Sequence, residues 1–191
     1  MPNKTRCAWA ANGCPEEIAY HDTEWGVPCF DDKSQFEFLV LESAQAGLSW
    51  RTILLRRSGY EALFAGFDPV KVAEFDPARV EELMLDARII RNRKKIESAI
   101  NNARRFLEVQ AQHGTFCNYI WDFVGGKPLV NRWQTMREVP ATTELSDRLA
   151  KDLKQKGFKF LGSTVLYAHL QATGLVNDHT IDCFRHRECR I

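Results

Sequence analysis

The stretch Leu41-Glu42-Ser43-Ala44-Gln45-Ala46-Gly47-Leu48-Ser49-Trp50 joins the end of a predicted helix to a sharp turn. Positions 36, 39, 40 and 43 share one face of that helix, and Glu42 lies one step off this face. Gly47 is placed as a glycine that ends a helix, and Ser49 is suited to cap the next one. A carboxylate and an indole beside one tight turn suit a pocket for a flat, polar ligand. The spacing fits equally well with an ordinary interhelical turn, in which Leu48 and Trp50 fill the core.

The composition is that of an ordinary globular protein, with 191 residues, 45% of them hydrophobic and 27% charged. This length suffices for one substantial domain, and we treat residues 1–191 as a single unit. The net charge of +1 argues against bulk electrostatic capture of nucleic acid, but it leaves room for a local basic face. The sequence contains no apolar run of membrane-spanning length and no signal-peptide core, so we expect a cytoplasmic protein without membrane association.

Helical periodicity recurs along the chain, and no segment alternates as a strand would, so we expect an all-α fold. Asp68-Pro69 and Asp76-Pro77 each combine an acidic cap with a proline suited to the first helical position. A long helix is expected after Asn92. Further helices are expected near residues 15–21, 31–45, 49–57, 116–123, 145–155 and 163–173, with a loop over 127–143 and a last short helix capped by Asp178.

Cysteines and histidines gather near both ends of the chain, where they suggest a metal site. His179 and Cys183 are four residues apart, so they would share one face of the predicted last helix. With Cys7 and His21 they would form a closed Cys2His2 site suited to zinc. A rival, wholly local set is His179, Cys183, His186 and Cys189. Free thiols and surface histidines are the third interpretation. Either set of four ligands would be structural, because it leaves no position open for water or substrate.

The segment 83–96 predicts two helices joined by a short turn, with five basic residues at or after that turn. Among them are Arg88, Arg91 and Arg93. Backbone N–H groups at a helix N-terminus, with arginines nearby, suit a phosphate of nucleic acid. A solvated basic helix start is the simpler interpretation of such a run.

Three aromatic residues, Tyr20, Trp25 and Trp50, do not lie on clean apolar stripes. Aromatic rings beside a carboxylate such as Glu42 suit a pocket for a flat or cationic base. Each ring taken alone is also interpretable as an anchor that packs a loop on the core.

Several long and irregular motifs follow one another along the chain. They are Cys7, Tyr20–Pro28, Glu42 with Gln45–Trp50, Gly157–Phe160 with Gly162, and Gly174–His179. Together they resemble the 3-methyladenine DNA glycosylase I family, over roughly residues 6–184. The resemblance implies an all-α helix-hairpin-helix glycosylase fold with a zinc-binding lobe formed by both termini. Residues 34–105 would contain the hairpin, at about 80–97, and residues 1–33 with 106–191 would form the lobe.

The resemblance also implies an activity and the residues that carry it. The protein would flip 3-methyladenine out of alkylated double-stranded DNA, hydrolyse its N-glycosidic bond and release the free base. Glu42 would be the catalytic carboxylate, chiefly by recognising the base in a pocket lined by Tyr20, Trp25 and Trp50. Gly47 and Leu48 would occupy the gap left by the flipped nucleotide. One structural zinc ion would be bound by Cys7, His21, His179 and Cys183.

The sequence shows no Schiff-base lysine, so we expect no lyase step, and Asp122 lies outside any catalytic-aspartate motif. We also expect a monomer. The chain departs from the family pattern at Arg88 and Lys95, where glycines are expected in the hairpin turn and just after it. Charge at these positions would bind a phosphate and steepen the salt dependence. These two residues motivate an alternative function, a non-catalytic, zinc-stabilised DNA-binding protein. A third possibility, a zinc hydrolase, would require an open metal position.

Overall fold

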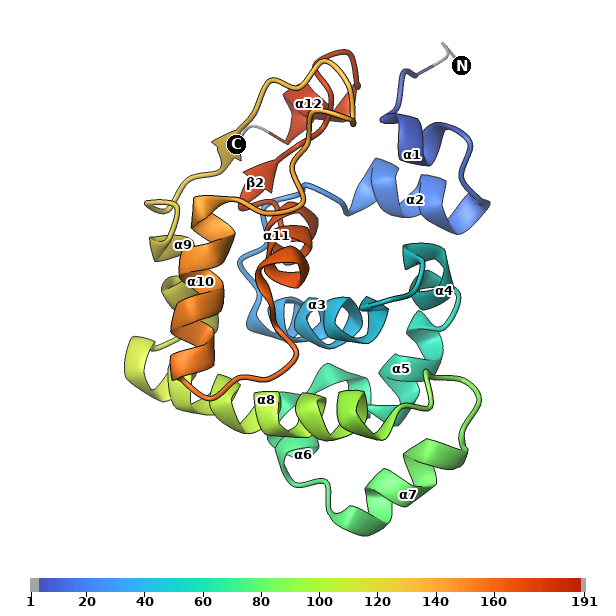
Figure 1. Ribbon diagram of the computed structural model, residues 1–191, viewed down its shortest axis with the longest axis vertical. Coiled ribbons are helices and arrows are strands. Elements are labelled where there is room, and N and C mark those ends of the chain that lie inside the picture. Colours follow the sequence, from blue (N-terminus) through green and yellow to red (C-terminus); the bar gives the residue numbers. More distant parts are fainter. Residues whose placement is uncertain (1–3, 190–191) are drawn as a thin grey trace.

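The computed structural model describes residues 4–189, so both ends of the predicted 1–191 unit lie outside the described residues. The fold is mostly helical, as predicted (Figure 1). Its helices are α1 (Ala8–Ala11), α2 (Pro15–Thr23), α3 (Asp32–Gln45), α4 (Trp50–Leu54), α5 (Arg57–Leu63), the 3-10 turn η1 (Ala65–Phe67), α6 (Pro69–Ala73), α7 (Pro77–Leu85), α8 (Arg93–His113), α9 (Phe116–Asp122), α10 (Glu144–Gln155), α11 (Ser163–Ala172) and α12 (Arg185–Glu188). None of these described helices is both long and apolar enough to cross a membrane.

The predicted helix starts are confirmed by their capping hydrogen bonds. The Asp68 carboxylate accepts from the backbone N–H groups of Val70 and Lys71 at the start of α6. Asp76 caps α7 in the same way, and the side chain of Asn92 caps α8. Each of these side chains satisfies helix N–H groups that have no partner within the helix.

Helix α3 runs through the centre of the molecule, against α8, α9 and α11 (Figure 1). Phe36 on this helix is fully buried and meets Phe106 of α8 edge-on, with ring centroids 5.3 Å apart. At its start, Asp32 accepts hydrogen bonds of 2.8 Å from the N–H groups of Phe116 and Cys117, and so caps α9. The far end of α3, which carries Glu42 and the Gly47 turn, is therefore held by a rigid core.

The structure corrects two predictions for the C-terminal half. Leu129–Val130 (β1) and Val176–Asn177 (β2) pair in parallel, although residues 127–143 were expected to be a loop. No helix begins at Asp178, because its carboxylate accepts hydrogen bonds from four side chains instead of capping backbone N–H groups. The donors are Asn131, Trp133, Tyr167 and Gln171. Residues 178–180 are irregular, residues 181–184 form turns, and the last described helix is α12.

The two ends of the described chain pack against each other. Phe184 N–H donates to the carbonyl of Thr5 over 3.0 Å, and Gly26 N–H donates to the carbonyl of Gln171 over 3.1 Å. Gly26 has a φ of +81°, and a Cβ added there would lie 2.8 Å from Nε2 of His179, so a side chain does not fit. The segment 20–26 is thereby held against the C-terminal segment.

Candidate functional site

Four side chains from the two ends converge into one buried cluster: Cys7, His21, His179 and Cys183. Nδ1 of His179 lies 3.4 Å from Sγ of Cys7 and 3.5 Å from Sγ of Cys183, and Nε2 of His21 lies 3.5 Å from Sγ of Cys183. Tetrahedral zinc with sulfur and nitrogen ligands separates its donor atoms by roughly 3.4–3.8 Å. Both the type and the spacing of these donors fit a closed zinc site.

The remaining ring nitrogens of the two histidines are also occupied. Nδ1 of His21 lies 2.8 Å from Asp22, which also forms an ion pair with Arg6. Nε2 of His179 lies 3.0 Å from the carbonyl of Trp25. Such contacts orient a histidine so that its other nitrogen faces the metal. Hydrogen bonding between the two thiols lowers the pKa of Cys183 and raises the pKa of Cys7, so Cys183 is the thiol of this pair that ionises first.

The local rival set does not assemble. Nε2 of His186 hydrogen-bonds to the carbonyl of Asn131 over 2.8 Å, away from the cluster. Sγ of Cys189 lies 4.0 Å from Nε2 of His179, whereas the two thiols of the cluster face Nδ1 of that ring. Among the described residues, the one group found suitable for a metal ion is the split set.

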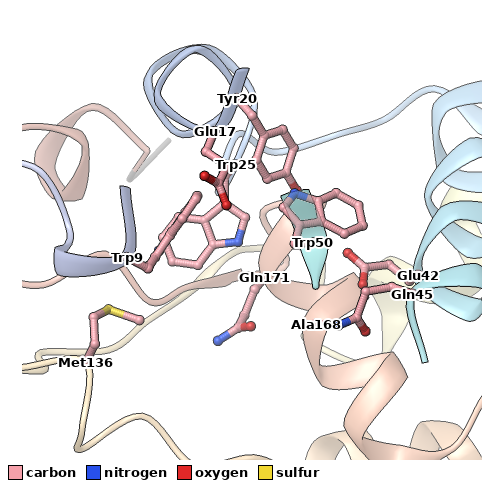
Figure 2. Close-up of a pocket in the computed structure, with 10 residues that line it drawn as sticks. All are labelled: Trp9, Glu17, Tyr20, Trp25, Glu42, Gln45, Trp50, Met136, Ala168 and Gln171. Atoms are coloured by element: carbon pink, nitrogen blue, oxygen red, sulfur yellow. The ribbon is translucent and has the colours of Figure 1, made fainter. Parts of the chain in front are cut away.

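A cavity of about 340 Å³ opens beside this cluster, a size typical of small-molecule sites. Figure 2 shows its lining, which is Trp9, Glu17, Tyr20, Trp25, Glu42, Gln45, Trp50, Met136, Ala168 and Gln171. Tyr20 and Trp50 lie with ring centroids 5.3 Å apart, and Trp9 and Trp25 with centroids 5.2 Å apart. The predicted aromatic residues therefore do share one pocket with the predicted carboxylate.

Glu42 is the buried carboxylic acid of this cavity, with 4% of its surface exposed. Burial raises the pKa of Glu42 to about 8, and no ion pair to it exists among the described residues. A cation placed beside this group would favour its ionised form. The site is thus suited to a ligand that brings a positive charge with it.

Two hydrogen-bond donors in the same pocket lack partners. The Tyr20 hydroxyl and Nε1 of Trp50 are both buried, and neither has a hydrogen bond in the structure. Buried polar groups are rarely left unpaired, because each costs on the order of 1–3 kcal/mol. We therefore expect a bound ligand to supply hydrogen-bond acceptors for these two donors. The same ligand would carry a donor for the Glu42 carboxylate.

Sequence reasoning missed six lining residues, namely Trp9, Glu17, Gln45, Met136, Ala168 and Gln171. Trp9 stands two residues from Cys7, and this proximity was the one available signal. Ala168 and Gln171 are three apart and so share a face of α11, but nothing in the sequence indicates where that face points. Met136 lies on the long connection between β1 and α10, whose path only the tertiary structure defines.

The predicted DNA-contacting residues lie on or near two turns, one after α3 and one between α7 and α8. Gly47 has a φ of +81° with no atom near its missing Cβ, and Leu48 is 37% exposed. Arg88, Arg91 and Arg93 are all exposed on or after the α7–α8 connection. Arg88 forms an ion pair of 2.6 Å with Asp86, and Arg93 one of 2.7 Å with Glu81, so each already has an acidic neighbour.

Lys95 lies just after the hairpin turn, as predicted, but its ammonium group donates to the protein itself. This residue lies in the first turn of α8, and its Nζ donates to the carbonyls of Ala44 and Ala46 over 2.7 and 2.6 Å. Burial lowers the pKa of Lys95. The ammonium group caps the C-terminus of α3 and ties it to α8, so it is not displayed to a phosphate. Arg88 lies in the connection between the two helices, and its side chain is exposed.

Comparison with known proteins gives concordant matches. Residues 9–186 match the family described as methyladenine glycosylase. DNA-3-methyladenine glycosylase 1 of Escherichia coli (strain K12) is 49% identical over 178 residues, covering 93% of this chain and 95% of that protein. A crystal structure of 3-methyladenine DNA glycosylase I superimposes with a TM-score of 0.90 at 46% identity, covering 94% of this chain and 98% of that one.

A structure that describes 3-methyladenine recognition by the Staphylococcus aureus 3-methyladenine DNA glycosylase I has a TM-score of 0.89 at 37% identity and covers 94% of each chain. The helical fold, the aromatic cavity around a buried carboxyl group and these matches define the class of the protein as a DNA glycosylase. Within this class, the chain belongs to the methyladenine glycosylase family. The resemblance noted in the sequence is thereby confirmed.

Proposed function

We propose that the protein excises 3-methyladenine from alkylated double-stranded DNA, as a monomer and without a lyase step. The observation that carries this proposal is the cavity, in which a buried carboxyl group and two unpartnered donors lie among aromatic rings. Methylation at ring nitrogen 3 makes the base cationic in DNA, and the cation would restore the ionised form of Glu42 as it binds. A normal adenine is neutral and therefore lacks this electrostatic attraction to the Glu42 carboxylate.

Little acid catalysis is needed, because the cationic base leaves as a neutral molecule. The main task of the protein is to capture the flipped nucleotide, which costs a few kcal/mol in unstacking and unpairing. Stacking against Trp50 and Tyr20 offsets part of that cost, and cation–π attraction adds about 1–2 kcal/mol for the charged lesion. Glu42 accepts a hydrogen bond from the exocyclic amine and stabilises positive charge in the base or the sugar. After cleavage the base is neutral, which favours its release.

The turn at Gly47–Leu48 is proposed to fill the gap that the flipped nucleotide leaves. Leu48 is a large apolar side chain exposed at the end of α3, a few residues from Glu42 and Trp50. Lys95 fixes this end of α3 to the first turn of α8, so the turn and the α7–α8 hairpin would meet DNA as one surface. Arg88, Arg91 and Arg93 would contact phosphates on this surface.

The absence of a lyase step is proposed from the lining of the cavity. None of the described lining residues is a lysine, so no amine is available to form a Schiff base with the sugar. A monofunctional glycosylase should therefore leave an intact abasic strand that breaks only when alkali is added.

One zinc ion is proposed to bind to Cys7, His21, His179 and Cys183. Bound zinc supplies a cross-link between the termini and no catalytic chemistry, because four protein ligands close its coordination shell. The ligand residues themselves support the pocket. His21 follows Tyr20 on α2, and His179 contacts the carbonyl of Trp25.

The test is release of free 3-methyladenine from methylated duplex DNA, with wild type and Glu42→Ala assayed side by side. We expect release by wild type, a strand that stays intact without alkali, and a loss of base affinity in the variant. Wild-type excision by Glu42→Ala would refute the pocket assignment. Tight binding to duplex DNA without any base release would instead favour the non-catalytic DNA-binding protein, whose sequence argument is weakened by the internal role of Lys95.

A further inference from the structure

Asp178 is a buried carboxylate at the centre of a network of hydrogen-bond donors. Its Oδ1 accepts from Nδ2 of Asn131 and Nε1 of Trp133, both over 2.7 Å. Its Oδ2 accepts from the Tyr167 hydroxyl and from Nε2 of Gln171, the latter over 2.8 Å. Only 1% of Asp178 is exposed, so water does not compete for these contacts. Nothing in the proposed excision reaction accounts for this network.

The network fixes the direction of the Gln171 side-chain amide. An ionised carboxylate only accepts hydrogen bonds, and of the two ends of an amide only the NH2 end donates. Nε2 of Gln171 must therefore face Asp178, and Oε1 must face the other way. Gln171 lines the base cavity. In Figure 2 its amide oxygen lies on the side of Trp50 and Glu42, and its nitrogen lies on the opposite side.

The second amide of the cavity is oriented in the same sense. Nε2 of Gln45 donates to the carbonyl of Leu48 over 2.6 Å, which leaves its Oε1 as the end free for a ligand. Among the described residues, no donor contacts Oε1 of Gln171. Both amides therefore direct their Oε1 acceptors to a ligand in the cavity. An amide without such a fixed Nε2 contact could rotate and offer its NH2 group instead.

We propose that Gln171 is a specificity-determining residue and that Asp178 is its positioning residue. Oε1 of Gln171 accepts a hydrogen bond from the exocyclic amine of the bound purine, which carries two hydrogens and thus suits Glu42 and Gln171 together. A purine with a carbonyl oxygen in place of that amine would set two acceptors against each other. The site therefore selects 6-aminopurines over 6-oxopurines. This inference rests on the proposed function and identifies Gln171 as a further residue that recognises the exocyclic amine of the base.

The experiment compares two free bases, 3-methyladenine and 3-methylhypoxanthine, which carries an oxygen in place of the amine. Their dissociation constants are measured by quenching of the pocket tryptophans. The readout is the ratio of the two constants, because other differences between the ligands cancel when a variant is compared with wild type. Gln171→Met removes the acceptor at similar length, and we expect the preference for 3-methyladenine to fall roughly 3- to 10-fold.

Asp178→Asn gives the sharper test, because it replaces one acceptor oxygen by a donor NH2 group without changing the shape of the side chain. Its Oδ1 still accepts from Asn131 and Trp133, while its new NH2 group faces Tyr167 and Gln171. The Gln171 amide then turns over to accept from this NH2 and presents its own NH2 to the pocket. We expect the ratio to shift toward the oxopurine by roughly 10- to 100-fold, since an acceptor is lost and a donor is gained.

Tyr167→Phe is the matched control. It removes a neighbouring donor from Asp178 but leaves the contact with Gln171, so stability changes while the base ratio stays at the wild-type value. An equal shift of the ratio in this control would mean that the network acts only by general packing, and it would overturn the inference. So would an unchanged ratio in both Gln171→Met and Asp178→Asn. Failure of wild type to bind 3-methyladenine at all would refute the proposed function as well, which keeps the two failures distinct.

Discussion

Replacing the buried acid, Glu42→Gln, should abolish the pH dependence of stability that this residue imposes. Its pKa rises from an ordinary value of 4.5 to about 8 in the folded protein, because burial penalises the charge. A raised pKa means that folding favours the protonated form. The resulting stability is fully present below about pH 4.5 and is lost progressively as the pH rises through about 8.

The size of the effect follows from the two pKa values. A tenfold change in acidity corresponds to about 1.4 kcal/mol, so a rise from 4.5 to about 8 corresponds to roughly 5 kcal/mol. About two thirds of this amount is already lost at pH 7. For a chain of 191 residues, 1 kcal/mol shifts the melting temperature by about 2–4 °C. The variant should therefore gain up to roughly 10–20 °C over wild type between acidic and alkaline pH.

The assay is urea unfolding of wild type, Glu42→Gln and the exposed-site control Glu61→Gln at pH 5, 7 and 9. The free energy of unfolding of Glu42→Gln should rise relative to wild type at each step, whereas the control should run parallel to wild type. In parallel, kcat/KM of wild type for excision should increase with pH up to about 8, because recognition of a cation needs the carboxylate. Parallel stability curves for wild type and Glu42→Gln would refute the reasoning.

Four other perturbations have expected outcomes. Cys183→Ser should lose the metal, measured as zinc per chain, and lower the melting temperature, whereas retention of stoichiometric zinc would contradict the ligand set. Lys95→Met should lower the free energy of unfolding by about 1.5–3 kcal/mol, because two carbonyls lose a charged donor, with the salt dependence of DNA binding unchanged. Arg88→Ala should do the opposite, barely affecting stability while reducing the salt slope by about one. Leu48→Ala should leave the melting temperature nearly unchanged yet slow excision, and equal excision in single-turnover assays would exclude Leu48 from the proposed gap-filling role.

Local signals were reliable wherever the chemistry was local. The caps at Asp68, Asp76 and Asn92 act within three residues, so the sequence contains all that is needed to predict them. The stop at Gly47 is equally local, because its positive φ is a property of one residue. The strand pairing of β1 with β2 escaped prediction because two residues per strand are too few to show alternation.

Asp178 shows why other features could not be predicted. Its carboxylate was assigned to a helix cap on local grounds, but donors up to 47 residues away compete for it and prevail. His179 and Cys183 still converge, through turns instead of a helix face. Lys95 was interpreted as a surface charge because nothing nearby indicates the two carbonyls, about 50 residues earlier, to which it donates. Gln171 was overlooked for the same reason, since its orientation depends on tertiary partners.

The joining of the two ends has a consequence for synthesis on the ribosome. Tyr20 and Trp25 emerge early, but the residues that hold them emerge late: Cys183 follows His21 by 162 residues, and His179 follows Trp25 by 154. At about 5–20 residues per second, this interval lasts roughly 8–30 s. During that time Tyr20 and Trp25 lack their contacts with the C-terminal segment, and the thiol of Cys7 is not yet buried against His179 and Cys183. Chains that stop before residue 179 should therefore contain much of the core but no formed base pocket, so we expect them not to bind the base.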